Sequence, residues 1–186
     1  MRLPPIKYDD LNSEQKRLHD VVTKTRSSGL GGPMSVLVRA PHVGEPADAM
    51  HNAFRLKTKL DRKILELLIL IVARRHGSEF AWKVHERLAL KTGLEQHAID
   101  AIRERRTPHF NDEKLETLYD IVRELLDTSG LCDTSYGRGL DAFGLDLMIE
   151  IVAATGFYSM VSLVLNTFEV NAPGGKSALA YGARME

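Results

Sequence analysis

One carboxylate stands inside the most apolar stretch of the sequence. Every residue from Ile64 to Ala73 is apolar except Glu66. A carboxylate among aliphatic side chains must either be paired or gain affinity for protons through desolvation, and that gain is what a general acid or base requires. Arg62 lies four residues earlier, which is the spacing of an ordinary ion pair on a helix surface. The sequence leaves both interpretations of Glu66 open.

A histidine follows on the next expected helix. His85 comes three residues after Trp82, four after Ala81 and seven after Ser78, so helical spacing puts these residues on one face. A histidine beside a bulky aromatic ring suits proton transfer, whereas a half-buried histidine stacked on tryptophan is the structural alternative. An antiparallel helix pair joined at the "HGS" turn could bring His85 to Glu66, and we take these two as the candidate catalytic pair.

Composition and motifs narrow the possible functions. Lys plus Arg and Asp plus Glu both number 25, so no basic excess favours a nucleic-acid partner. The single cysteine, Cys132, excludes a disulfide framework and a cysteine-based zinc cluster. The seven histidines show no HxH, HxxxH or HExxH spacing, and no P-loop or dinucleotide-binding glycine pattern is present. We expect neither a metal nor a cofactor.

Nearly all of the sequence has the periodicity of helices, which predicts an all-α protein. Asn12 or Ser13 caps the first helix, Pro46 opens the second, and one short helical turn is expected around Val36 in the loop between them. Gly156 is expected to separate the last two helices. The predicted helices span residues 12–29, 46–59, 61–76, 79–91, 94–105, 113–130, 140–156 and 157–173.

The chain is expected to form a single domain, residues 1–186, with a core of about 11–173. The tail 174–186 lacks periodicity and is predicted to be a mobile arm or a strap on a partner subunit. The stretch 144–165 is apolar on more than one face, which favours a homo-oligomer. No signal peptide is seen, and the longest apolar run is too short to span a bilayer, so we expect a cytoplasmic protein without a membrane partner.

Glu66, His85 and the residues between them resemble a known pattern. Members of one protein family start a helix with Cys-x-x-Cys-x-x-x-His and carry a glutamate a dozen residues before it. Counting back from His85, the cysteine positions fall on Ser78 and Ala81, and Glu66 lies twelve residues before Ser78. The chain thus resembles the carboxymuconolactone decarboxylase and alkylhydroperoxidase D-like proteins, as a member without the two thiols. The resemblance covers roughly Leu11 to Pro173.

This resemblance implies a helical bundle of antiparallel helix pairs that assembles as a trimer or hexamer, with a dimer as a further option. The form "GSEFAWKVH" is similar to the decarboxylase-type branch, which acts on a small lactone carrying a carboxylate and uses no cofactor. His85 would then donate the proton, and Glu66 would orient and tune His85 or exchange protons with it. The residues expected to bind the substrate are Ser78, Trp82 as an apolar wall, Tyr158 and Asn166.

Two other functions stay open at the level of sequence. The first is an alkylhydroperoxidase- or peroxiredoxin-like antioxidant oxidoreductase. Because both thiols of the motif are absent, it would either work without a thiol or rely on Cys132. The second is a helical oligomer that binds a small molecule without turnover. Arg39, Arg55 and Arg74 are candidates for holding a substrate carboxylate, because a guanidinium matches that geometry.

Overall fold

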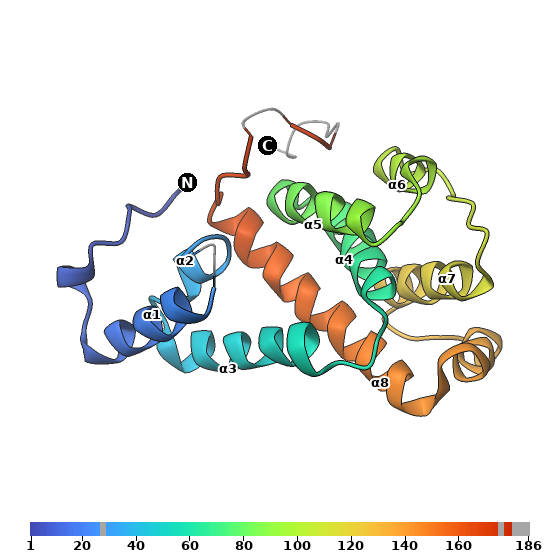
Figure 1. The fold of residues 1–186 in the computed structure, drawn as a ribbon, viewed down its shortest axis with the longest axis horizontal. Coiled ribbons are helices and arrows are strands. Elements are labelled where there is room, and N and C mark those ends of the chain that lie inside the picture. Colours follow the sequence, from blue (N-terminus) through green and yellow to red (C-terminus); the bar gives the residue numbers. More distant parts are fainter. Residues whose placement is uncertain (27–28, 175–176, 180–186) are drawn as a thin grey trace. The chain divides into compact units, whose positions relative to one another are not determined.

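The computed structural model describes residues 1–26, 29–174 and 177–179, and these residues form helices, turns and loops without a strand (Figure 1). The all-α prediction is confirmed. Two short pieces, the 3-10 turn Tyr8–Asp10 and the π turn Ala53–Lys57, accompany the α-helices. The α-helices are α1 (Ser13–Thr25), α2 (Met34–Leu37), α3 (Pro41–Asn52), α4 (Arg62–His76), α5 (Glu79–Lys91), α6 (Gln96–Arg103), α7 (Glu113–Thr128) and α8 (Asp133–Thr167).

The chain divides into two compact units. The first comprises Met1–Thr58 with Val164–Asn171, and within it α1 and α2 pack against α3. The second comprises Lys59–Leu163 with the described residues after Asn171, and within it α4 packs against α5, α6 and α7. The assignment of residues 1–186 to a single domain stays a prediction. Residues 175–176 and 180–186 of the predicted tail lie outside the described residues.

Helix α4 is the core helix of the second unit. Each residue from Leu65 to Ala73 is at most 4% exposed, so the helix is buried on every side. Its ends agree with the predicted range 61–76: the Asp61 side chain accepts a hydrogen bond from the Lys63 N–H at 2.7 Å, and Gly77 ends the helix at φ 61°. Burial of this central part of α4 leaves the Glu66 side chain with no exposed surface.

Helix α3 begins earlier than predicted. Pro41, not Pro46, occupies its first turn, and the N–H groups of Val43 and Gly44 both donate to the Ala40 carbonyl. A proline favours the first turn because its φ is already helical and its missing N–H has no helical acceptor there. Pro46 lies inside the helix, so its choice as the starting residue was wrong. The expected turn around Val36 is present as α2.

The break in the last helix was also misplaced. Helix α8 continues through Gly156 and is interrupted at Gly144, whose backbone adopts φ 71° and ψ 168°. Only glycine takes such a conformation readily, whereas an ordinary helical φ at Gly156 keeps the buried side chains of Ile151 and Ala154 in register with Phe157.

Helix α8 is longer than any single apolar run in the sequence. Among the described residues it is the one helix long and apolar enough, by length and composition, to cross a membrane, although the sequence runs were judged too short for this. One such helix is weak evidence for a membrane span, because the core helix of a protein can have the same length and apolar composition. The buried Ile151, Phe157 and Leu165 mark α8 as a helix that packs against protein.

Gly44 provides a test of the packing in the first unit. A Cβ at this position would lie 2.6 Å from the Leu37 carbonyl oxygen and 2.7 Å from the Leu18 side chain. We expect Gly44→Ala to lower the free energy of unfolding by about 1–3 kcal/mol, because the backbone of α2 must shift. Urea denaturation measures this change. Gly137→Ala is the control: it adds a methyl group in open space on a helix and should be neutral or stabilise by up to about 1 kcal/mol. An equal loss in both variants would contradict this packing.

Candidate functional site

The Glu66 carboxylate and the His85 imidazole are in direct contact. Glu66 Oε2 lies 2.6 Å from His85 Nδ1, the Glu66 side chain is 0% exposed, and that of His85 is 15% exposed. A carboxylate accepts hydrogen bonds, so Nδ1 carries the hydrogen of this contact. Nε2 is then the ring atom left to exchange a proton with a ligand.

Arg62 binds the other oxygen of the same carboxylate. Its guanidinium lies 2.7 Å from Glu66 Oε1, and its side chain is 35% exposed. The ion pair and the histidine contact, which the sequence presents as alternatives, therefore exist together. The pair is not a surface pair, because Glu66 is buried, and removing one partner of a buried charge is far more costly than opening an exposed pair.

Tyr158 on α8 contacts the pair from a third helix. It is 4% exposed, and its ring meets the His85 ring edge-on, with centroids 6.0 Å apart and an interplanar angle of 75°. Phe157 packs against Tyr158 at 5.2 Å between centroids. Helices α4, α5 and α8 thus each supply one residue to a single cluster of Glu66, His85 and Tyr158. We call this cluster the Glu–His site.

Ser78 is the N-cap residue of α5, but its hydroxyl makes no capping hydrogen bond. The residue is 0% exposed, and its Oγ has no hydrogen-bond partner among the residues that the structure describes. A buried hydroxyl without a partner is uncommon in native proteins and costs free energy. The assignment of Ser78 to substrate binding stays a prediction.

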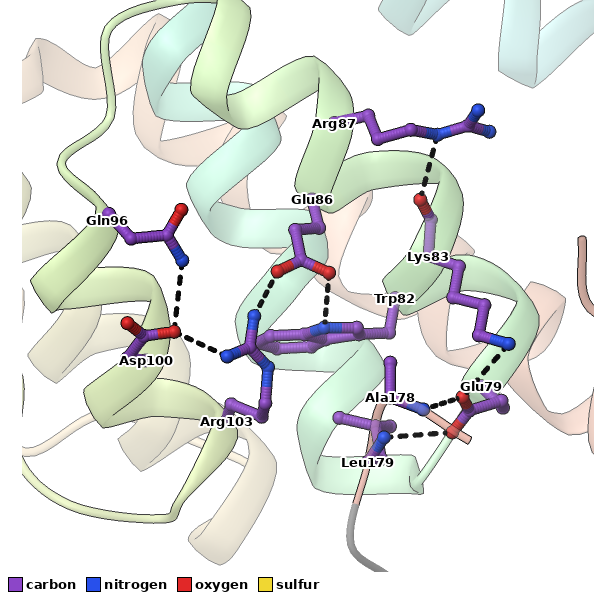
Figure 2. A network of polar contacts seen from close by, with 10 residues as sticks. All are labelled: Glu79, Trp82, Lys83, Glu86, Arg87, Gln96, Asp100, Arg103, Ala178 and Leu179. Atoms are coloured by element: carbon purple, nitrogen blue, oxygen red, sulfur yellow. Dashed lines mark hydrogen bonds and ion pairs between the residues drawn. The ribbon is translucent and has the colours of Figure 1, made fainter. Parts of the chain in front are cut away.

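Trp82 is buried in the core of the second unit. Its side chain is 0% exposed, its indole N–H donates to Glu86 Oε2 at 3.1 Å, and the Arg103 guanidinium carbon lies 5.6 Å from the ring centroid (Figure 2). Arg103 also bonds the carboxylates of Glu86 and Asp100. Both the face and the edge of the indole thus contact residues of this chain, and the role of Trp82 as an apolar wall against a substrate ring stays a prediction.

The remaining predicted residues are divided between the two units. Asn166 and Arg55 belong to the first unit, as does Arg39, which donates to the Pro4 carbonyl. The structure therefore does not group Asn166 with the Glu–His site in one unit. Arg74 lies in the second unit, is 8% exposed, and donates through Nε to the Arg103 carbonyl at 2.6 Å.

The described part of the C-terminal tail docks on α5 of the same chain. The Glu79 carboxylate accepts hydrogen bonds from the Ala178 N–H and the Leu179 N–H, and it pairs with Lys83 (Figure 2). It also accepts a hydrogen bond from the Ser177 hydroxyl. Leu179 is 1% exposed. Sequence reasoning missed this contact, because no local pattern links residues about a hundred positions apart.

Cys132 lies in the segment before α8 and is exposed. Its thiol bonds the Ser135 hydroxyl at 3.4 Å, and its N–H donates to Glu124 Oε1 at 2.6 Å. Hydrogen bonds from Ser135 and from the Cys132 N–H lower the pKa of the Glu124 carboxyl. The contacts of this thiol are thus with residues outside the Glu–His site.

The fold and the site together define an all-helical protein with a buried glutamate–histidine pair on two antiparallel helices. Residues 41–124, which include both members of the pair, match the carboxymuconolactone decarboxylase family. This stretch of the chain is similar to that family, and the match confirms the resemblance seen in the sequence.

Comparison with solved structures agrees on the fold. One matching chain is described as an alkylhydroperoxidase core, an uncharacterized peroxidase-related protein from Ralstonia eutropha JMP134. The TM-score is 0.74, and the match covers 93% of this chain and 92% of that chain at 13% identity. An identity this low shows a shared fold alone. A comparison with curated proteins yields no significant match.

Proposed function

We propose that the protein is a cofactor-independent lyase that decarboxylates a small lactone or unsaturated carboxylic acid of the carboxymuconolactone type. The observation that carries the proposal is the 2.6 Å contact between Glu66 and His85 inside the core. Serine and alanine stand where the family's thiol branch has its cysteines, so this pair can move protons but has no adjacent sulfur to relay them to.

The reaction needs one proton at one carbon. The bond between the substrate ring and its carboxylate breaks, carbon dioxide leaves, and the bonding electrons move into the conjugated lactone carbonyl. The resulting dienolate accepts a proton on carbon from His85 Nε2, and solvent restores that proton afterwards. Glu66 orients the imidazole through Nδ1, and Arg62 holds the carboxylate in place. Both are positioning residues in this scheme.

Two further side chains support the substrate in the proposal. The Ser78 hydroxyl, buried and without a described partner, donates to a substrate oxygen. Tyr158, edge-on to His85, limits the space around the ring and keeps it dry. Low local dielectric strengthens the contacts that stabilise the developing enolate. Asn166 remains a sequence-based candidate from the other unit.

A peroxidase is the second candidate, because a protein of the same fold is described as peroxidase-related. Such an activity would need Cys132, which is exposed and bonded to Ser135. We favour the lyase, because a thiol peroxidase needs its proton-transfer groups beside the sulfur.

The proposal includes a cytoplasmic homo-oligomer. Four large apolar side chains are exposed on one face of α8, at spacings of four, three and eleven residues, and Gly156 stands on the same face. We call them the α8 stripe: Leu145 (59% exposed), Ile149 (60%), Val152 (45%) and Leu163 (55%). An apolar face of this kind supports contact between copies of the chain, since soluble monomers rarely expose one.

The first prediction concerns the catalytic pair. With carboxymuconolactone as the probe, we expect wild-type protein to release carbon dioxide, and Glu66→Gln and His85→Asn each to lower kcat about 100-fold or more. Glu66→Gln keeps the side-chain volume while removing the charge that orients the imidazole. Carbon dioxide release and the deuterium content of the product in heavy water measure the proton transfer.

His109→Asn is the matched control, because His109 is 78% exposed on the protein surface. It should leave kcat unchanged, and circular dichroism should show that all variants are folded. Full turnover by Glu66→Gln would overturn the proton-transfer role. Binding of the lactone without release of carbon dioxide would instead favour a non-catalytic binding protein.

The second prediction separates the lyase from the peroxidase. We expect Cys132→Ser to leave any turnover of a hydroperoxide unchanged, because the thiol does not touch the Glu–His site. The assay follows peroxide consumption with a dithiol reductant. Ser135→Ala is the control, since it removes the neighbouring hydroxyl and keeps the thiol. Loss of turnover in Cys132→Ser alone would support the peroxidase.

The third prediction tests the α8 stripe. We expect light scattering after gel filtration to give a multiple of 20.8 kDa for the wild type and a smaller multiple for Ile149→Lys, because a buried lysine disfavours the interface. Leu90→Lys replaces an apolar residue that is 41% exposed and lies outside the stripe, so it should keep the wild-type mass. A monomeric wild type, or an unchanged mass for Ile149→Lys, would exclude this interface.

A further inference from the structure

A pocket of about 310 Å³ opens on the second unit, away from the residues of the Glu–His site. Helix α4 contributes Ile71 and two arginines, the end of α6 contributes Ile102, and α7 contributes Tyr119 and its last turns. Ile71 and Ile102 are each 4% exposed and Tyr119 is 8% exposed, and these three residues contribute apolar surface to the pocket. The volume is that of a site for a small organic molecule.

Positive charge gathers around this apolar surface. Four of the nine lining residues are arginines, and Asp127 is the one acid among them. Asp127 bonds Arg75 Nε at 3.0 Å and lies 3.9 Å from Arg123, so one carboxylate is shared by two guanidinium groups. The lining has a net formal charge of three positive, in a chain whose formal charge is zero. Such a concentration of positive charge attracts an anion.

Two of the arginines are held in position by other groups. Arg123 stacks on Tyr119, with its guanidinium carbon 5.5 Å from the ring centroid. Arg74 is 8% exposed, and its Nε donates to the Arg103 carbonyl at 2.6 Å. Groups that are already oriented lose less entropy when a ligand binds.

Arg105 has a backbone conformation that glycine would take more readily. Its φ is 59°, and the N–H of the next residue, Arg106, donates to the Ala101 carbonyl as α6 ends. A side chain at a left-handed position is unfavourable, and residues held in this way cluster at binding sites. Here the side chain of Arg105 lines the pocket, which gives a reason for arginine at this position.

We propose that this pocket binds a small amphipathic anion, with a phosphate or carboxylate group held by Arg75, Arg105 and Arg123. The apolar part of the ligand lies against Ile71, Ile102 and Tyr119. Guanidinium groups bind either oxyanion in a forked geometry, so the two head groups share one chemistry. The site shares no residue with the Glu–His site, and its test does not depend on the proposed lyase activity.

Titration calorimetry with three probes tests the ligand class. We expect phenyl phosphate to bind one equivalent per chain, and inorganic phosphate to bind about tenfold or more weakly because it leaves the apolar surface uncovered. Phenylacetate should also bind, whereas benzyl alcohol, which has no charge, should not. Absence of binding by both anions, or equal affinity for inorganic and phenyl phosphate, would overturn the proposal.

Substitutions of the pocket arginines test whether the anion binds in this pocket. Arg123→Gln should weaken phenyl phosphate binding about tenfold, because one charged hydrogen bond is lost. Arg105→Gly should weaken it similarly while raising the midpoint of thermal unfolding, since glycine relieves the left-handed backbone. This opposite effect on stability separates loss of binding from loss of folding.

Arg106→Gln is the matched control. Arg106 neighbours Arg105 in the chain, pairs with Glu104 at 2.7 Å, and does not line the pocket. Its removal should leave the affinity unchanged. Equal weakening by Arg106→Gln and Arg105→Gly would mean that the anions respond to general surface charge, and the pocket would be excluded as their site.

Discussion

A carboxylate cannot lie among aliphatic side chains unless its two oxygens are satisfied, and this requirement organises the second unit. Glu66 is fully buried in α4, and Arg62 and His85 each bind one of its oxygens. Arg62 comes from the same helix, whereas His85 must be delivered by α5. The sharp turn at Gly77 places α5 antiparallel to α4, so the polar contact and the apolar packing of the two helices require the same geometry.

Helix α5 joins this buried pair to the polar surface of the unit. Trp82 is fully buried, yet its indole N–H reaches Glu86, and Arg103 covers the ring while bonding Glu86 and Asp100. About one turn before Trp82, the Glu79 carboxylate accepts hydrogen bonds from the Ala178 and Leu179 N–H groups. A helix held by charged contacts on its outer side and by packing on its inner side has little freedom to move His85. That rigidity is what a positioned acid or base needs.

The similarity to known proteins concerns the fold and the family, and it does not by itself fix the chemistry. The match to a peroxidase-related structure at 13% identity concerns the fold, and the match of residues 41–124 concerns the family. Replacement of both thiol positions by Ser78 and Ala81 leaves an acid–base pair without a sulfur nucleophile beside it. Proton transfer to carbon is the chemistry that such a pair can still perform, and it underlies the proposed lyase.

Local signals in the sequence were sufficient for most helix boundaries. Asp61, Gly77 and Asp112 stand where the structure has the ends of α4 and α7, because caps and left-handed glycines satisfy or terminate backbone hydrogen bonds within a few residues. The predicted start of α3 and the predicted break in α8 were wrong, because two prolines or two glycines were possible at each place. Pro46 and Gly156 lie inside helices, since neighbouring packing and the alternatives at Pro41 and Gly144 decided the ends.

The sequence by itself determined the helical class, the family pattern and the choice of Glu66 and His85, because these depend on residue types and short spacings. Only the tertiary structure decided that both Arg62 and His85 bind Glu66, that Trp82 is covered, and that arginines from different elements surround one pocket. These facts depend on distances between helices. Such distances are set by side-chain packing across the whole unit, which no local run of residues encodes.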